Sequence, residues 1–256
     1  MRIFDGFDNL PRIASPVVTV GSYDGVHSGH RELLGLINST AAARGGESVV
    51  VTFRPHPRVV LGKAEGLRLL SSQREKEALL EQAGVDNLVV VPFTPEFSRV
   101  EAEAFVRDYL VGRLGVDTLV VGYNHHFGHN KSGDFGFLDR LRAELGFDVL
   151  EVPRHRCDDH RVSSTEIRRL IEAGDMGGAA RLLGRNYTAL MYPGADGSLA
   201  TDDALKLMPP EGTYAVTVDE GTMLSPNMLS VGPKGRYELF FPLFATPERV
   251  TVSFCR

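Results

Sequence analysis

Residues 21–30 combine glycines and histidines in a spacing suited to holding a phosphate group. They read Gly-Ser-Tyr-Asp-Gly-Val-His-Ser-Gly-His, between an apolar run at 16–20 and a helical pattern at 31–37. This pattern predicts a turn from a strand into a helix, where outward-facing N–H groups and the helix dipole attract anions. His27 and His30 stand three residues apart. We expect both to project to one side of the first helical turn.

Glycine-rich turns of this kind are common, so phosphate binding depends on what the rest of the chain adds. Apolar segments alternate with helical patterns from about residue 16 to 153. They are short and rich in Val and Leu without clean alternation, as expected of strands covered on both faces. The expected strands are 17–21, 48–53, 87–92, 118–122 and 147–152. The alternation predicts an α/β domain with right-handed crossovers and a parallel sheet.

The helical patterns between these strands carry start signals and end at glycines. Ser72 and Glu75 form a capping-box signature, and Ser98 and Glu101 repeat it. The expected helices are 31–43, 73–82, 102–114 and 135–145.

All eight histidines lie in the loops that would follow the five strands. In a parallel sheet, ligands bind beyond the carboxyl ends of the strands, where the strand order reverses. The loops are 21–30, 54–58, 93–97, 123–134 and 154–165. Histidine positions and strand predictions are separate observations, so their agreement favours one site for an anionic small molecule over chance clustering.

Two of these loops suit a flat, phosphorylated ligand. The loop at 54–58 is stiffened by two prolines and carries cations, although stiffness for stability alone is the alternative. The loop at 123–134 mixes histidines, aromatic residues and glycines. A zinc site there is disfavoured, because His125 and His126 are adjacent and no cysteine or helical histidine pair completes a tetrahedral set.

The stretch Val-Ser-Ser-Thr-Glu-Ile-Arg at 162–168 predicts a second helix start. Ser163 or Ser164 would cap it, reinforced by Glu166, and Arg168 would add a cation to a second phosphate cradle. Such serines cap many helices for stability alone. Two cradles, one after the first strand and one after the last, favour phosphate binding.

Composition excludes several classes of protein. The net charge of −5 argues against broad nucleic-acid binding. No apolar run approaches a membrane span, and the start of the chain lacks the apolar core of a signal peptide. Cys157 and Cys255 show no metal or disulfide spacing, so we expect a cytoplasmic protein with free thiols and no membrane partner.

Four motifs in order resemble the adenylyltransferase module of the prokaryotic bifunctional riboflavin kinase/FMN adenylyltransferase (FAD synthetase) family. They are Gly-x-x-Asp-Gly-Val-His-x-Gly-His at 21–30, Thr-Phe-x-Pro-His-Pro at 52–57, Gly-Tyr-x-His-x-Phe-Gly at 122–128 and Val-Ser-Ser-Thr-x-Ile-Arg at 162–168. The resemblance implies a Rossmann-like nucleotidyltransferase domain at 1–187 and a small, mostly β domain at 188–256. It also implies transfer of AMP from ATP to FMN with Mg²⁺, which yields FAD and pyrophosphate.

The resemblance assigns roles by position. Catalytic roles fall on His27, His30 and Arg168. The residues implied to bind ATP are Gly21, Ser22, Tyr23, Asp24, His27, Gly29, His30, Asn124, Ser163, Ser164, Thr165 and Arg168. Those implied to bind the flavin are Phe53, Pro55, His56, Pro57 and Phe127, and no protein-held metal is implied. Since FMN brings its own phosphate nucleophile, the protein needs only to align the reactants and stabilise charge.

The sequence departs from the family pattern in three places. Ser22-Tyr23 stand where Asn-Phe is usual, and Asn124 stands where Asp is usual. The Gly-x-Pro-Thr-Ala-Asn stretch of the kinase module is absent, and residues 201–205 occupy its expected region. We expect a shrunken antiparallel sheet without riboflavin kinase activity, which serves packing, regulation or assembly.

Two other functions remain open. One is nucleotidyl transfer to a different phosphorylated acceptor. The other is a flavin- or nucleotide-binding protein that has lost catalysis, which the departures at Ser22 and Asn124 motivate.

Overall fold

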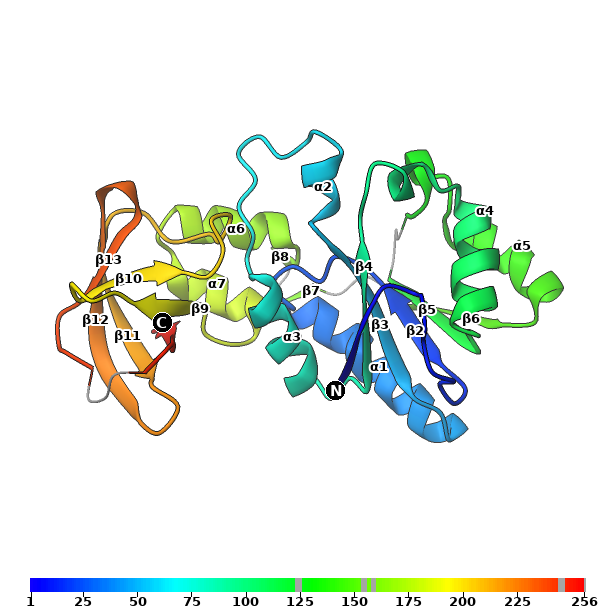
Figure 1. Ribbon diagram of the computed structural model, residues 1–256, viewed down its shortest axis with the longest axis horizontal. Coiled ribbons are helices and arrows are strands. Elements are labelled where there is room, and N and C mark those ends of the chain that lie inside the picture. The colour runs from blue at the N-terminus through cyan, green and yellow to red at the C-terminus, as the bar shows by residue number, and fades with distance from the viewer. Residues whose placement is uncertain (123–125, 153–155, 158–159, 244–246, 256) are drawn as a thin grey trace. The chain divides into compact units, whose positions relative to one another are not determined.

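The computed structural model describes residues 1–122, 126–152, 156–157, 160–243 and 247–255 (Figure 1). The chain forms two compact units. The first comprises Met1–Tyr23, His30–Leu67 and Glu77–His155, and the second comprises Asp24–Gly29, Arg68–Lys76 and Arg156–Arg256. Two short segments from the first third of the chain therefore belong with its C-terminal part. Among the described residues, no helix is both long and apolar enough to cross a membrane.

A six-stranded parallel sheet forms the centre of the first unit, in the order β1-β4-β3-β2-β5-β6 (Figure 1). The strands are β1 (Arg2–Asp5), β2 (Val17–Val20), β3 (Ser48–Arg54), β4 (Asn87–Pro92), β5 (Thr118–Gly122) and β6 (Asp148–Val152). The predicted α/β fold is confirmed. Strands β4 and β5 have the predicted bounds, and β2, β3 and β6 differ from prediction by one residue at one end. The strand order reverses between β2 and β5, which is the point where a ligand site is expected.

Strand β1 is absent from the sequence prediction. Among the strands that the structure describes, it lies at the edge of the sheet and pairs with β4. Its side chains remain largely accessible, and Ile3 is 50% exposed. An edge strand therefore lacks the continuous apolar run that identifies a central strand.

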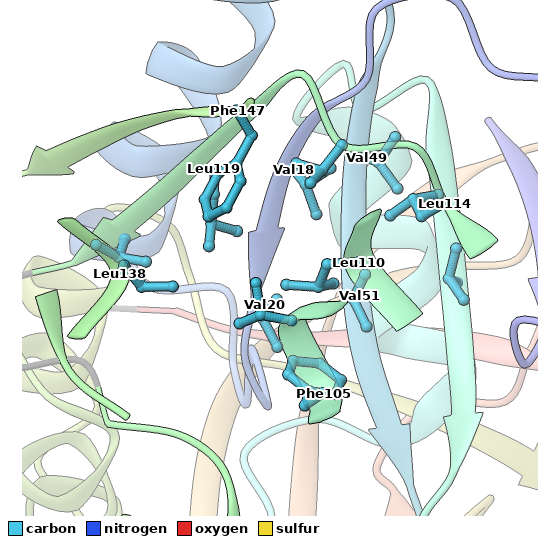
Figure 2. Packing of buried hydrophobic residues seen from close by; sticks show 14 of the residues in the cluster. Val18, Val20, Val49, Val51, Phe105, Leu110, Leu114, Leu119, Leu138 and Phe147 are labelled. Carbon is cyan, nitrogen blue, oxygen red and sulfur yellow. The ribbon is translucent and has the colours of Figure 1, made fainter. Parts of the chain in front are cut away.

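The core of the first unit consists of apolar side chains from the sheet and from the helices that pack on it (Figure 2). Val18, Val49 and Val51 of the central strands are fully buried, as are Leu110 and Leu138 of the packing helices. Burial of each such side chain contributes about 1.5–3 kcal/mol. Apolar burial therefore fixes the position of the sheet.

Helices connect the strands of this unit. They are α1 (Ser28–Arg44), α2 (Pro57–Val60), α3 (Gln73–Gln82), α4 (Ala102–Ala104) and α5 (Phe135–Leu145), with single 3₁₀ turns η1 (Phe97–Arg99) and η3 (His129–Lys131). Helices α3 and α5 have the predicted bounds, and α1 begins three residues before its predicted start. The capping box before α3 is confirmed. The backbone N–H of Ser72 donates to Glu75 Oε2 at 2.8 Å, and the N–H of Glu75 donates to Ser72 Oγ at 3.2 Å.

The single α-helix predicted at 102–114 is wrong. One turn of α4 passes into the π-helix η2 (Phe105–Arg113). The spacing of apolar residues fits both helix types, so the sequence pattern does not separate them. The capping pair predicted before this helix is wrong as well. The Ser98 hydroxyl donates to the Pro95 carbonyl at 2.7 Å, and the N-cap Glu101 makes no side-chain capping bond.

The second unit contains two helices and a closed six-stranded antiparallel barrel, in the order β10-β13-β12-β11-β14-β9. The helices are α6 (Ser164–Glu172) and α7 (Met176–Leu183). The barrel strands are β9 (Thr188–Pro193), β10 (Ser198–Thr201), β11 (Gly212–Asp219), β12 (Leu224–Gly232), β13 (Arg236–Leu239) and β14 (Val250–Phe254), with a 3₁₀ turn η4 (Pro233–Gly235). A short hairpin, β7 (Arg156–Cys157) and β8 (His160–Arg161), precedes α6.

The mostly β C-terminal part is thus confirmed, but it is more complete than the shrunken sheet that the sequence suggested. Strand β10 pairs with both β9 and β13, which closes the barrel. The barrel shares one core with α6 and α7, in which Ile167, Ile171, Leu183, Tyr187 and Val252 are all buried.

Candidate active site

The glycine- and histidine-containing turn lies between β2 and α1. Because α1 begins at Ser28, His30 is its third residue and His27 precedes the helix. The first helical turn therefore contains only one of the two histidines expected there. His27 is buried at 7% exposure, and His30 and Gly29 are half-buried.

The backbone of this turn is held in a conformation that side chains rarely adopt. Tyr23, Gly25 and Val26 have φ values of 48°, 82° and 38°. For Tyr23 and Val26 a left-handed backbone costs about 1–2 kcal/mol each. Such a conformation persists only where contacts with the surrounding structure hold it in place, and it is frequent at ligand-binding turns.

Asp24 anchors the turn. Its side chain is buried, and its Oδ1 accepts the backbone N–H groups of Leu70 at 2.9 Å and of Ser71 at 3.1 Å. The next residue, Gly25, donates its N–H to Ser71 Oγ at 3.0 Å. A side chain at Gly25 would meet Leu70, because an added Cβ would lie 2.8 Å from the Leu70 Cδ1 atom. The turn therefore sits tightly against residues 70–71.

The start of α6 binds the same turn. Ser163, one of the two predicted candidates, is its N-cap, and its hydroxyl oxygen accepts the N–H of Glu166 at 3.2 Å. The Ser164 hydroxyl donates to the Asp24 carbonyl at 3.0 Å. Arg168 forms an ion pair with Asp24 Oδ2. Thus the second unit joins the two predicted phosphate cradles directly, through residues 24, 164 and 168.

Arg168 is also held from its other side. Its Nε donates to the Arg68 carbonyl at 2.6 Å, and its side chain is 14% exposed. A guanidinium bound to a carboxylate and a carbonyl of its own chain acts first as a support for the turn. The sequence analysis predicted that Arg168 binds phosphates. It did not predict the ion pair with Asp24.

Two further residues fix the turn and are missing from the sequence prediction. Arg185 Nη2 donates to the Gly25 carbonyl at 2.9 Å, and the Ser71 hydroxyl receives the Gly25 N–H. Arg185 belongs to the Leu-Gly-Arg-Asn-Tyr stretch at 183–187. Its positive charge is the feature of the sequence that could have marked it as a site residue. Nothing local distinguishes Ser71 from any other serine before a helix.

The remaining residues of the first predicted cradle lie in the first unit. Gly21 donates its N–H to the Val51 carbonyl at 3.0 Å, and the Ser22 carbonyl accepts Thr52 Oγ1 at 3.4 Å. The Tyr23 hydroxyl bonds Thr19 Oγ1 at 2.7 Å, and its ring lies 5.0 Å from that of His30. Burial raises the pKa of the Tyr23 phenol well above its ordinary value, which the Thr19 bond partly offsets. Thr165 is exposed on α6, and Asn124 lies outside the described residues.

The predicted flavin residues occupy two settings in the first unit. Phe53 packs against Phe93 at 5.4 Å and Phe97 at 6.1 Å between ring centroids. Phe127 packs against Phe105 at 6.1 Å, and Phe105 also contacts Phe97, so one aromatic cluster contains both predicted rings. The sequence prediction missed Phe93 and Phe97, although they are the first and last residues of the loop 93–97 that follows β4.

The other predicted flavin residues form the start of α2. The His56 side chain accepts the Arg58 N–H at 3.2 Å, which makes it the N-cap, and Pro57 is the first helical residue. Pro55 is exposed. Among the residues that the structure describes, no group of three or more His, Cys, Asp or Glu side chains is arranged to hold a metal ion.

Comparisons with known proteins identify the family of this chain. Residues 11–166 match the FAD synthetase family. The chain is 33% identical over 242 residues to the bifunctional riboflavin kinase/FMN adenylyltransferase of Pseudomonas fluorescens, covering 91% of this chain and 78% of that protein. Its identity to the Escherichia coli K12 protein of the same name is 32% over 189 residues, covering 73% of this chain but only 60% of that protein.

A solved structure matches nearly the whole fold. It is titled a macrolide-efflux protein from Streptococcus pneumoniae, and the two structures superpose with a TM-score of 0.84 at 25% identity. The match covers 99% of this chain and 88% of the other, so both units have counterparts in it. Since the family match spans more than half of the sequence, this chain belongs to the FAD synthetase family.

Proposed function

We propose that this chain is an FMN adenylyltransferase, which transfers AMP from ATP to FMN and releases pyrophosphate. The observation that carries the proposal is the turn at 24–29, anchored through Asp24 to the start of α6 in a member of the FAD synthetase family. Two helix N-termini that share one turn provide N–H donors and positive dipole ends for a triphosphate. A cytoplasmic setting is part of the same proposal.

The proposed reaction needs no covalent bond between the protein and a substrate. An oxygen of the FMN phosphate attacks the α-phosphorus of ATP, and the bond from that phosphorus to the β-bridging oxygen breaks as pyrophosphate leaves. The nucleophile is already an anion at neutral pH, so no side chain has to remove a proton from it. Catalysis then rests on alignment of the reactants and on stabilisation of charge around the α-phosphate.

Several of the predicted residues have a place in this proposal. His27, His30 and the first N–H groups of α1 would donate to the ATP phosphates, with Gly29 allowing their close approach. Ser163 and Thr165 would add donors at the start of α6. Asp24 and Arg168 support the turn by pairing with each other, and Arg168 would in addition add positive charge near the outer phosphates.

Mg²⁺ would arrive with the nucleotide. It prefers oxygen ligands and usually keeps several waters, so the phosphates and one or two protein oxygens suffice. Phe53 and Phe127, with the cluster around them, would offer aromatic faces to the flavin ring.

We also propose that the 188–256 region has no riboflavin kinase activity. Asp202 and Lys206, which lie in or next to the region of the missing kinase motif, are bound within the chain. Ser72 Oγ donates to Asp202 Oδ2 at 2.7 Å, and Lys206 is paired with Glu75. Burial raises the pKa of Asp202 above its ordinary value, because a charged carboxylate is less well solvated there.

The test is one incubation with three acceptors. Purified protein with ATP and Mg²⁺ receives FMN, riboflavin or another phosphorylated acceptor, and the products are separated by chromatography. We expect FAD and pyrophosphate from FMN, and no FMN from riboflavin. ATP turnover only with a different acceptor would support another nucleotidyltransferase, and tight binding without turnover would support a binding protein.

A further inference from the structure

A single peptide group lies between two buried charges in the second unit. The Leu70 carbonyl accepts the Lys206 ammonium at 2.8 Å, and the Ser71 N–H of the same peptide donates to Asp24 Oδ1 at 3.1 Å. Lys206 lies between strands β10 and β11, whereas Asp24 is the anchor of the glycine- and histidine-containing turn. Because the peptide is planar and rigid, its oxygen and its N–H group move together.

Lys206 has all the partners that an ammonium group can use. It is 5% exposed, and it donates to Glu75 Oε2 at 2.7 Å and to the Thr188 carbonyl at 2.6 Å as well as to Leu70. These three acceptors match its three protons. Its ammonium also lies 4.4 Å from the centre of the Tyr187 ring. Burial lowers the pKa of Lys206, and the carboxylate of Glu75 opposes that shift.

Glu75 holds the other side of this pair. Its Oε1 accepts the Leu190 N–H of β9 at 2.6 Å, and its Oε2 accepts the Ser72 N–H of the capping box. The ion pair therefore joins the start of α3 to the barrel. Buried ion pairs add little net stability compared with apolar residues of similar volume, so stability alone does not explain why one stands here.

The segment at 68–72 bonds to the barrel on one side and to the turn on the other. Leu69 makes two backbone hydrogen bonds to the residues between β10 and β11. Its N–H donates to the Leu205 carbonyl at 2.7 Å, and its carbonyl accepts the Leu207 N–H at 2.8 Å. The next two residues bind Asp24 and Gly25. A shift of this segment would therefore shift the turn.

We propose that Lys206 is a positioning residue for adenylyl transfer, acting through the Leu70–Ser71 peptide on Asp24 and the turn that carries His27. This inference rests on the proposed function, because it assigns the barrel a part in that reaction. In a chain of polarised hydrogen bonds the charge of Lys206 strengthens the Ser71 bond to Asp24. The barrel then acts on the nucleotide without touching it.

The test uses the double variant Lys206→Met/Glu75→Gln. Methionine keeps the approximate volume of the lysine side chain. Glutamine can still form the capping box, and it avoids leaving a buried Glu75 carboxylate without its lysine. We expect kcat/KM for ATP to fall on the order of 10-fold to 100-fold, as for a misplaced reacting group. Hydrogen exchange at the amides of residues 25 and 71 should accelerate. Lys206→Arg, which keeps the charge, should recover part of the loss.

The matched control is Leu229→Ala, which opens a cavity at a fully buried position of the barrel core and removes none of the hydrogen bonds that join residues 68–72 to Lys206 and Asp24. It should lower the unfolding midpoint and leave kcat/KM for ATP and exchange at residues 25 and 71 unchanged when measured well below that midpoint. If the double variant keeps wild-type kcat/KM, the inference is overturned while the proposed function stands. If wild-type protein makes no FAD, both are overturned.

A second variant covers the case in which the double variant does not fold. Ser71→Ala removes the hydroxyl that receives the Gly25 N–H and leaves both ion pairs in place. We expect kcat/KM for ATP to drop on the order of 10-fold, since a small displacement of reacting groups has effects of this size or larger. Wild-type kcat/KM in Ser71→Ala, together with unchanged exchange at residue 25, would show that contacts from the 68–72 segment do not position the turn, and this result would also overturn the inference.

Discussion

The parallel sheet of the first unit and the anchored turn of the second unit are held by different kinds of interaction. The centre of the sheet is packed by valines and leucines such as Val18, Val51 and Leu138. The turn is held by the buried pair Asp24–Arg168 and by backbone bonds to residues 70–71. Apolar packing is non-directional, whereas a buried charge needs partners at particular positions.

This difference separates stability from function. A core tolerates volume-conserving changes and loses free energy roughly in proportion to the atoms removed. A polar network loses its geometry when one member goes, because the remaining members are left unsatisfied. We therefore expect substitutions in the sheet to lower stability and substitutions at the turn to lower turnover.

The largest effect is expected from His27→Ala/His30→Ala, which removes the two proposed phosphate donors at the turn and the start of α1. Loss of one donor to developing charge typically costs about 10²–10³ in kcat. The double variant should therefore form no detectable FAD while its circular dichroism spectrum and unfolding cooperativity stay as in the wild type. A folded double variant with wild-type turnover would remove the assigned mechanism.

Asp24→Ala should affect both properties. It leaves the Arg168 guanidinium, 14% exposed, without its carboxylate, and breaking a buried pair from one side costs about 3–5 kcal/mol. Denaturant unfolding measures this loss. The control is Arg169→Ala, which breaks the exposed pair with Glu166 on the same helix and should leave the unfolding midpoint unchanged. Equal midpoints for the two variants would show that the Asp24 pair is not an anchor.

Leu138→Ala tests the sheet unit. The side chain is fully buried in the core of Figure 2, so its truncation should lower the free energy of unfolding by about 2–5 kcal/mol. Turnover measured well below the new midpoint should stay near the wild-type value. Leu150→Ala, at a position 36% exposed on β6, should change stability much less. A loss of kcat in Leu138→Ala at full folding would contradict the separation.

The smallest effect concerns Tyr23 at alkaline pH. Burial raises the pKa of its phenol above the unfolded value near 10, so the folded state keeps a proton that the unfolded state releases. Stability should therefore be complete below about pH 10 and fall as the pH rises above it, by at most about 1.4 kcal/mol per pH unit for this group. Tyr23→Phe should make that fall shallower. An identical pH dependence in both proteins would contradict the assignment.

The sequence predicted the parts of the molecule that depend on local pattern. The bounds of β4 and α3 and the capping box at Ser72 and Glu75 follow from apolar runs and start signals. The π-helix at 105–113 did not follow, because apolar spacing fits two helix types. Closure of the barrel did not follow either, since it depends on long-range pairing of β10 with β9 and β13.

The site divides in the same way. The turn at 21–30 and an N-cap at Ser163 or Ser164 were predicted from residue type and spacing, and the structure selects Ser163. The pairs Asp24–Arg168 and Glu75–Lys206 were not, because they join residues more than one hundred positions apart. The alternation Leu205-Lys206-Leu207 even suggests an exposed lysine between two buried leucines. Only the folded chain shows that this lysine is buried among backbone carbonyls.

The account is tested most directly by following both ends of ATP through a single turnover. Protein in excess over ATP labelled at the α- and γ-phosphates receives Mg²⁺ and FMN, and the products are separated and counted. The account predicts α-label in FAD and γ-label in pyrophosphate in equal amounts. Release of γ-labelled inorganic phosphate, or α-label that remains in AMP while FMN is unchanged, would contradict it.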